Sequence, residues 1–246
     1  LELSQIERMK GSYAGKNLLI VANGPSAVRF GSLPVAEFKR HGGLIMGMNF
    51  ANLNPALEGT ELDFFVSADR RPAQDPDLHK YLSDFSGIRV FVPEIRIGVW
   101  RKALPSQDLI LFCRVLVRYL RAPWWHNGPH KPKGFVASTG LHALQIAKWL
   151  GFDNIFFIGL DNSYFREFEA NIEGGLTQRM THAGEEDTFE TFSSDTASFL
   201  RGQSQLFMDF WTFSAPNIFN LDQLSYTDAF EKIDISSAWV QTQTRD

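Results

Sequence analysis

Short runs of consecutive apolar residues recur along the chain, with polar or helix-like segments between them. The runs are five or six residues long and cover residues 17–22, 44–48, 62–67, 88–92, 154–159 and 217–221. Continuous apolar runs of this length suit strands that are buried on both faces, as in a parallel sheet. The pattern therefore predicts an α/β fold with a mostly parallel central sheet.

The clearest helix begins after Ser138 and Thr139, since either hydroxyl can cap it, and Gly151 stands where a left-handed terminal residue is wanted. Its apolar face comprises Leu141, Leu144, Ile146, Ala147 and Leu150. A second helix is expected from Asp195 or Thr196 through Phe210. Helices that alternate with strands through right-handed crossovers build an open, doubly wound sheet.

Two segments lack this pattern. Residues 93–134 include a stretch at 123–134 that is dense in Pro and Gly, so we expect a long loop there. Residues 166–194 are predicted to form an irregular or helical lid beside the site. We expect the chain, residues 1–246, to form a single nucleotide-binding α/β domain with these two elaborations.

Composition narrows the class of protein. The chain has 246 residues, of which 44% are hydrophobic, and a formal net charge of −4, so no overall field attracts it to nucleic acid. The single cysteine, Cys113, excludes an internal disulfide framework and a cysteine-rich zinc site. No apolar stretch reaches the roughly 18 residues of a membrane span. We expect a protein without a transmembrane segment, in the cytoplasm or at the inner membrane surface, and we leave a homo-oligomer open.

The strongest local signal is the turn Asn23-Gly24-Pro25-Ser26, which follows the first apolar run. Gly24 allows close approach of a ligand, Pro25 suits the first position of a helix, and a helix start offers unpaired N–H groups to an anion. The turn is neither a Gly-x-Gly-x-x-Gly fingerprint nor a P-loop. It predicts a phosphate-binding site, and an ordinary strand-to-helix link is the alternative.

Other polar residues stand where predicted strands end: Asn49, Ser67, Asp69 and Asp161. Open α/β sheets bind ligands outside the carboxyl ends of their strands, so we expect these residues to gather with Asn23 at one edge. Turn formation is the alternative role for each. For Asp69 we favour an ion pair with Arg70 or Arg71, or a hydrogen bond to a sugar, over a metal site. We predict no metal site.

Among the six histidines, His182 is the candidate general base, because it lies in the predicted lid and an imidazole titrates near neutral pH. His126 and His130 lie in the other loop, where they could bind an acceptor, a phosphate or nothing. His142 is expected to pack in the capped helix or to face solvent.

Several segments together resemble a known family. Residues 18–26 (LLIVANGPS), 48–50, 137–165 and 217–235 are similar to the bacterial sialyltransferases that use CMP-sialic acid in lipooligosaccharide synthesis. They also resemble a broader family of hydroxymethylpterin diphosphokinase-like proteins and motility-associated glycosylation factors. The resemblance implies a metal-independent transferase of variant Rossmann, GT-A-like fold that requires no cofactor.

Residue roles follow from the matching motifs. The residues implied to bind the nucleotide lie in two turns: Asn23, Gly24, Ser26, Ser138, Thr139 and Gly140. Asn49 would meet the cytidine phosphate or the donor sugar, and Asp161 the ribose or base. Tyr164 would meet the phosphate and His182 would be the base. That family has two tyrosines after its Gly-x-Asp motif, whereas here Phe165 follows the single Tyr164.

The leading prediction is a glycosyltransferase that moves a sugar, with sialic acid as one candidate, from a CMP- or other nucleotide-linked donor to a glycan acceptor. Two alternatives stay open. One is a Mg²⁺-dependent diphosphokinase acting on a pterin-like alcohol, with Asp69 and Asp161 as metal ligands. The other is a non-catalytic nucleotide-binding protein of polysaccharide assembly.

Overall fold

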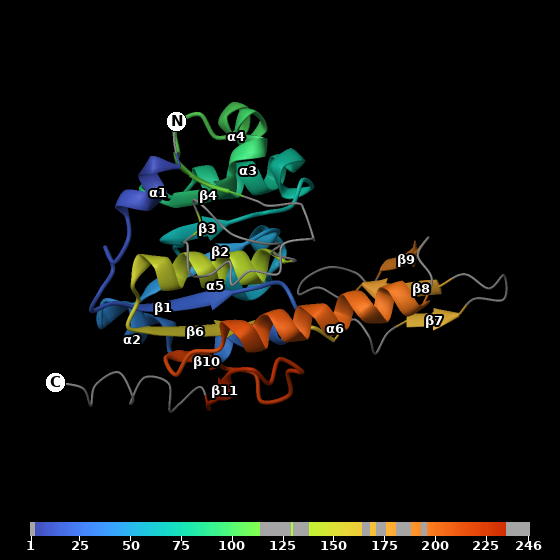
Figure 1. The fold of residues 1–246 in the computed structure, drawn as a ribbon. Coiled ribbons are helices and arrows are strands. Elements are labelled where there is room, and N and C mark those ends of the chain that lie inside the picture. Colours follow the sequence, from blue (N-terminus) through green and yellow to red (C-terminus); the bar gives the residue numbers. More distant parts are fainter. Residues whose placement is uncertain are drawn as a thin grey trace.

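An eight-stranded, all-parallel sheet forms the centre of the protein (Figure 1). The computed structural model describes residues 3–113, 129, 138–163, 168–170, 176–180, 188–192 and 196–234. The strand order is β11-β10-β6-β1-β2-β3-β4-β5. Helices cover both faces, so the prediction of a doubly wound, Rossmann-like α/β fold is confirmed.

Six of the strands coincide with the six apolar runs of the sequence, with ends that differ by a residue or two. The strands of the main sheet are β1 Asn17–Val21, β2 Leu44–Met48, β3 Phe64–Val66, β4 Arg89–Pro93, β5 Asp108–Phe112, β6 Asn154–Ile158, β10 Ile218–Asn220 and β11 Glu231–Lys232. Strand β1 is central, since Leu18 pairs with Leu44 of β2 on one side and with Ile155 of β6 on the other.

Each face of the sheet has its own hydrophobic core, because successive side chains of a strand point to opposite faces. Leu18 and Ile20 of β1 pack in one core, and Leu19 and Val21 pack in the other. The first core is covered by α1 Ser4–Arg8, α5 Thr139–Leu150 and α6 Thr196–Phe213. The second is covered by the 3₁₀ helix η1 Pro25–Ser32 and by α2 Val35–Arg40, α3 Pro76–Ser83 and α4 Ile97–Ala103. Burial on both faces explains why the strands are uninterrupted apolar runs.

Four short 3₁₀ turns complete the main body: η2 Ala51–Leu53, η3 Pro55–Leu57, η4 Pro72–Gln74 and η5 Glu94–Arg96. The predicted helix caps are confirmed at α5. The Leu141 N–H donates to the Ser138 side chain at 3.2 Å, and Gly151 ends the helix with a φ of 86°. Helix α6 begins at the predicted Thr196 and extends three residues beyond Phe210.

The predicted long loop at 93–134 was wrong over its first part. Residues 94–112 form η5, α4 and β5, because Trp100 of α4 is fully buried and β5 continues the parallel sheet beside β4. Residues 114–128 and 130–137, which include His126 and His130, lie outside the described residues.

The predicted irregular lid at 166–194 was also wrong in part. Strands β7 Phe168–Ala170, β8 Leu176–Met180 and β9 Thr188–Phe192 form a separate antiparallel sheet, which lies beyond the N-terminal end of α6 (Figure 1). Pairing with β8 supplies the backbone hydrogen bonds that single extended segments would lack. His182 and Tyr164 lie outside the described residues.

None of the helices in the described ranges combines the length and apolar composition that a bilayer crossing requires.

Candidate functional site

The order of the strands places a topological switch point beside β1. The chain builds the sheet outward from β1 to β5, and β6 then returns to the other side of β1. In doubly wound sheets, ligands bind in the crevice outside the carboxyl ends of the strands at such a point. Asn23 follows β1 and Asp161 follows β6, so both predicted site residues lie at this edge.

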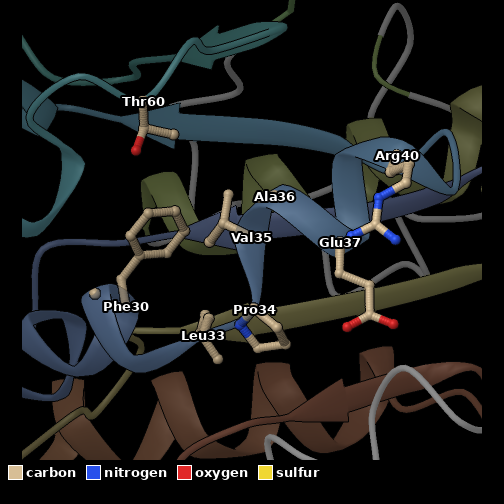
Figure 2. A pocket seen from close by; sticks show the side chains of 9 residues that line it. Phe30, Leu33, Pro34, Val35, Ala36, Glu37, Arg40 and Thr60 are labelled. Atoms are coloured by element: carbon tan, nitrogen blue, oxygen red, sulfur yellow. The ribbon is translucent and has the colours of Figure 1, made fainter.

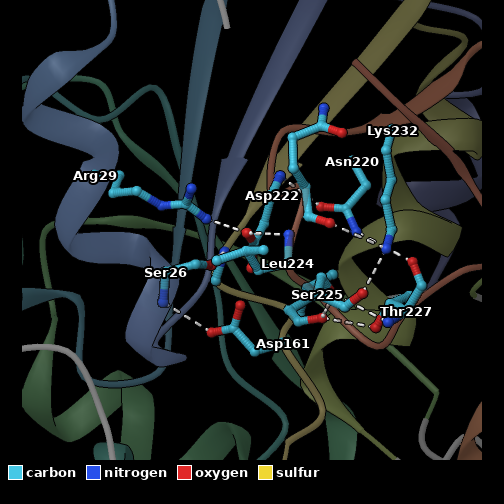
Figure 3. Close-up of polar contacts among 12 residues, drawn as sticks. Ser26, Arg29, Asp161, Asn220, Asp222, Leu224, Ser225, Thr227 and Lys232 are labelled. Atoms are coloured by element: carbon cyan, nitrogen blue, oxygen red, sulfur yellow. Dashed lines mark hydrogen bonds and ion pairs between the residues drawn. The ribbon is translucent and has the colours of Figure 1, made fainter. Parts of the chain in front are cut away.

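The corner formed by Asn23, Gly24, Pro25 and Ser26 is joined closely to the end of β6. The Gly24 N–H donates to the Gly159 carbonyl oxygen at 2.9 Å, and the Gly159 N–H donates to Ser26 Oγ at 2.9 Å. The Ser26 N–H donates to Asp161 Oδ2 at 2.9 Å (Figure 3). The Asp161 carboxylate therefore accepts the hydrogen bond from the Ser26 amide, where the sequence predicted a bound phosphate.

Gly24 is required by this close packing. A Cβ at residue 24 would lie 2.2 Å from Asp161 Oδ2 and 2.5 Å from the Gly159 carbonyl oxygen. Gly159 itself has a φ of 83°, in the left-handed region that favours glycine. The sequence correctly singled out Gly24 as a point of close approach, but the neighbouring group is a side chain of the protein itself.

The Asp161 and Asp222 carboxyls shift each other's pKa values in opposite directions. Burial, reinforced by a hydrogen bond to Asp222, raises the pKa of Asp161 to about 6, while hydrogen bonds from Ser26 act against that rise. Burial alone would raise the pKa of Asp222, but hydrogen bonds from Asp161, the Leu224 amide and Arg29 hold it below its usual value. Arg29 of η1 forms an ion pair with Asp222 (Figure 3).

The loop after β10 completes this network. The Leu224 N–H donates to Asp222 Oδ1 at 2.9 Å, and Thr227 Oγ1 donates to the Leu160 carbonyl oxygen at 2.7 Å. Sequence reasoning missed Arg29 and Asp222. The rule that selected Asp161, a polar residue near the end of a predicted strand, also applies to Asp222, which follows the run 217–221, and could have found it.

Asn23 connects the corner to the end of β2. In the amide orientation that satisfies both side-chain atoms, Asn23 Nδ2 donates to the Met48 carbonyl oxygen at 3.1 Å and Oδ1 accepts from the Phe50 N–H at 2.9 Å. These two groups flank Asn49, which has a φ of 47°. The expectation that Asn23 meets the nucleotide stays a prediction.

A second chain of hydrogen bonds runs from β2 across β3 to α5. Ser67 Oγ donates to Asn49 Oδ1 at 3.2 Å, and the Ala68 N–H donates to Thr139 Oγ1 at 3.4 Å. Ser67 and Thr139 are both buried. The structure thus brings together the ends of β2 and β3 and the start of α5, although these segments are far apart in sequence.

The start of α5 differs from the Asn23–Ser26 corner in how its backbone N–H groups are bonded. Ser138 caps the Leu141 amide, but no described residue accepts a hydrogen bond from the amides of Thr139 and Gly140. Helix α5 is twelve residues long, and the N-terminus of a helix carries unpaired N–H groups and a partial positive charge. A helix start of this kind favours a negative charge beside it.

Asp69 has a partner within its own loop. Its carboxylate, which is partly buried, forms a 3.4 Å ion pair with the exposed Arg71, so the predicted ion pair is confirmed. The Arg71 guanidinium also lies 5.9 Å from the centre of the Phe50 ring. Within the described ranges, no group of three or more His, Cys, Asp or Glu side chains is arranged to hold a metal ion.

A cavity of about 420 Å³ lies elsewhere, between η1 and α2 (Figure 2). Its lining includes Phe30, Leu33 and Val35, with Glu37 and Arg40 among its polar residues. None of the predicted site residues contributes to it. We therefore place the candidate site at the carboxyl edge of the sheet and not in this cavity.

The described residues of the predicted site all belong to the strand ends and helix starts of that edge: Asn23, Gly24, Pro25, Ser26, Asn49, Asp69, Ser138, Thr139, Gly140 and Asp161. His182 and Tyr164 cannot be placed among them, since both fall outside the described ranges. No protein-family model matches the chain, and no curated protein matches it at a significant level.

Proposed function

We propose that the protein is a glycosyltransferase that takes a sugar from a CMP- or other nucleotide-linked donor, and that the donor phosphate binds at the start of α5. One observation carries the proposal: the amides of Thr139 and Gly140, which donate to no described residue, lie at the end of two hydrogen bonds that link Thr139 to Ala68 and Ser67 to Asn49. These hydrogen bonds lie at the edge where doubly wound sheets bind nucleotides.

Electrostatics favours the start of α5 over the Asn23–Ser26 corner for the phosphate. At the corner, a phosphate would have to displace Asp161 from the Ser26 amide, and it would then face Asp222 as well. Like charges at such short range repel strongly when they are shielded from water. At the start of α5, no described carboxylate accepts a hydrogen bond from the amides of Thr139 and Gly140.

The resemblance to the sialyltransferases supplies the rest of the mechanism. His182 takes the proton from an acceptor hydroxyl while the acceptor oxygen displaces the nucleotide in a single step. Negative charge grows on the departing phosphate, and the α5 amides stabilise it. The reaction uses the nucleotide sugar and the glycan acceptor as substrates and needs no cofactor.

Binding is tested first, by thermal shift with CMP, CDP, UDP, GDP and ATP, each with and without Mg²⁺. A ligand that binds only the folded state raises the melting temperature, so at least one nucleotide should do so, and its uncharged nucleoside should not. A response to ATP alone that requires Mg²⁺ would favour the diphosphokinase instead.

Transfer is tested next, with the sugar donor of the nucleotide that binds. The His182→Ala variant should lose transfer and keep nucleotide binding, whereas His41→Ala, which alters an exposed histidine at the end of α2, should keep both. Unchanged turnover in His182→Ala would reject the base. Nucleotide binding without donor turnover in the wild type would indicate a non-catalytic binding protein.

A further inference from the structure

Asn49 has a backbone conformation that needs support. Its φ of 47° is positive, which among the described non-glycine residues is shared only with Asn162. A left-handed conformation is unfavourable for an ordinary L-residue, and Asn tolerates it better than most. The surrounding structure must therefore hold residue 49 in place.

The side chain of Asn23 provides that support from both sides. It donates to the carbonyl of residue 48 and accepts from the amide of residue 50, so its two hydrogen bonds bracket Asn49. The register of β1 and β2 pairs Leu18 with Leu44 and Val21 with Gly47, and its continuation sets residue 23 opposite residue 49. In a parallel ladder, one residue bonds to the two peptides that flank its partner. The Asn23 amide thus takes over this pairing where the β1 main chain turns away.

One donor group of Asn49, its side-chain Nδ2, has no acceptor among the described residues. The Asn49 N–H donates to the Val66 carbonyl oxygen at 3.1 Å, and Oδ1 accepts from Ser67 Oγ. Its Nδ2, by contrast, donates to no residue in the described part of the chain. An amide N–H₂ group beside the hydrogen bonds between β2 and α5 suits an anionic or hydroxyl-rich ligand.

We propose that Asn23 is a positioning residue, which holds Asn49 in its left-handed conformation so that Asn49 can donate to the nucleotide, and that Asn23 does not itself bind the ligand. The ligand part of this inference rests on the proposed function. The conformational part stands on the hydrogen bonds of Asn23 alone.

A double-mutant cycle separates positioning from direct contact. CMP affinity is measured by calorimetry for the wild type, Asn23→Ala, Asn49→Gly and the double variant. Glycine adopts a positive φ without support. Asn49→Gly therefore removes the Asn49 side chain, and residue 49 no longer needs the two hydrogen bonds of Asn23 to hold its conformation. Each single variant should bind CMP about tenfold more weakly, and Asn23→Ala should cause no further loss in the Asn49→Gly background. Additive losses would overturn the proposal, because Asn23 would then contact CMP itself.

Asn217→Ala is the matched control. The Asn217 side chain donates to the carbonyls of Phe152 and Asp153, at the opposite edge of the sheet, so its loss should reduce stability without changing CMP affinity. An equal loss of CMP affinity in this control would overturn the proposal, since it would reflect general destabilisation. If Asn23→Ala does not fold, Asn23→Asp replaces it: it keeps the acceptor for the Phe50 amide and loses the donor to Met48.

A readout without nucleotide keeps the inference testable if CMP does not bind, which would count against the proposed function only. The side-chain amide signal of Asn49 is followed by ¹⁵N–¹H NMR in the ligand-free protein. Asn23→Ala should shift this signal, and Asn217→Ala should not. An unchanged Asn49 signal in folded Asn23→Ala would overturn the proposal.

Discussion

Two helix starts meet at the same edge of the sheet, and they treat their free amides in opposite ways. At η1 the Ser26 amide is bonded to Asp161, a carboxylate that lies 135 positions away in the sequence. At α5 no described residue bonds to the amides of Thr139 and Gly140. Similar local elements can thus serve either as an internal joint or as a place for a ligand. A distant residue decides between the two, and the turn sequence alone does not.

The largest effect should come from breaking the joint at Gly24. In Gly24→Ala the new Cβ meets Asp161 and the backbone of Gly159, which cannot rotate away, so we expect a loss of about 3 kcal/mol in unfolding free energy. Urea denaturation measures it. Gly98→Ala is the control, because a Cβ there meets nothing within 4 Å. Equal stability of the two variants would contradict the tight joint.

Asp161→Asn tests the raised pKa of Asp161 through the pH dependence of stability. Because folding raises the pKa of Asp161 from 3.8 to about 6, this carboxyl contributes full stability below its unfolded pKa, and that contribution is lost as the pH rises through about 6. Asparagine keeps an acceptor for the Ser26 amide and carries no charge at any pH. At pH 8 the variant should be more stable than the wild type by about 2 kcal/mol.

That advantage should shrink towards pH 5, as urea denaturation at several pH values would show. The lowered pKa of Asp222 has the opposite effect on the stability of the protein. The stability that the Asp222 carboxylate contributes is present above its unfolded pKa and is lost as the pH falls below it. Glu58→Gln, at an exposed side chain to which no described residue hydrogen-bonds, should leave the profile unchanged. An Asp161→Asn advantage that is constant with pH would argue against a raised pKa of Asp161.

Asn49→Asp sharpens the comparison on the ligand side. The change keeps the oxygen that accepts from Ser67, but it adds a negative charge next to the proposed phosphate site. Charge repulsion, together with loss of the Nδ2 donor, should weaken CMP binding at least about tenfold, or roughly 1.4 kcal/mol, and should leave the affinity of uncharged cytidine nearly unchanged. Calorimetry at low salt measures both ligands. Equal losses for both would place the phosphate elsewhere.

The smallest effect concerns the cap of α5. In Ser138→Ala the Leu141 amide loses its acceptor, which should cost about 1 kcal/mol in unfolding free energy. Thermal or urea denaturation measures the loss, and bound CMP should still raise the melting temperature. A variant as stable as the wild type would show that the Ser138 cap contributes nothing.

Local sequence patterns predicted much of the fold. Strand β2 was predicted at its observed ends, 44–48, because an apolar run between polar turns is a local signal. The cap and terminal glycine of α5 are local as well. Strand β5 was missed because its apolar run, residues 109–112, was grouped with the basic residues that begin at Arg114, and pairing with β4 fixes where the strand ends.

The candidate site was predictable only in part. Because ligands bind at the carboxyl ends of parallel strands, the sequence alone predicted that Asn23, Asn49 and Asp161 lie at one edge of the sheet. It could not reveal that Asp161 fills the Ser26 amide or that Asn23 brackets Asn49, because these contacts depend on how separate loops pack. Long-range hydrogen bonds leave no periodic mark in the sequence.

The central claim is that the phosphate binds at the start of α5 and not at the Asn23–Ser26 corner. Backbone ¹⁵N–¹H NMR during titration with CMP tests it most directly, with cytidine as the uncharged control. We predict large CMP-specific shifts of the Thr139 and Gly140 amides, with the Gly24 and Ser26 amides nearly unchanged. Large shifts at Gly24 and Ser26, with none at Thr139 and Gly140, would contradict the account.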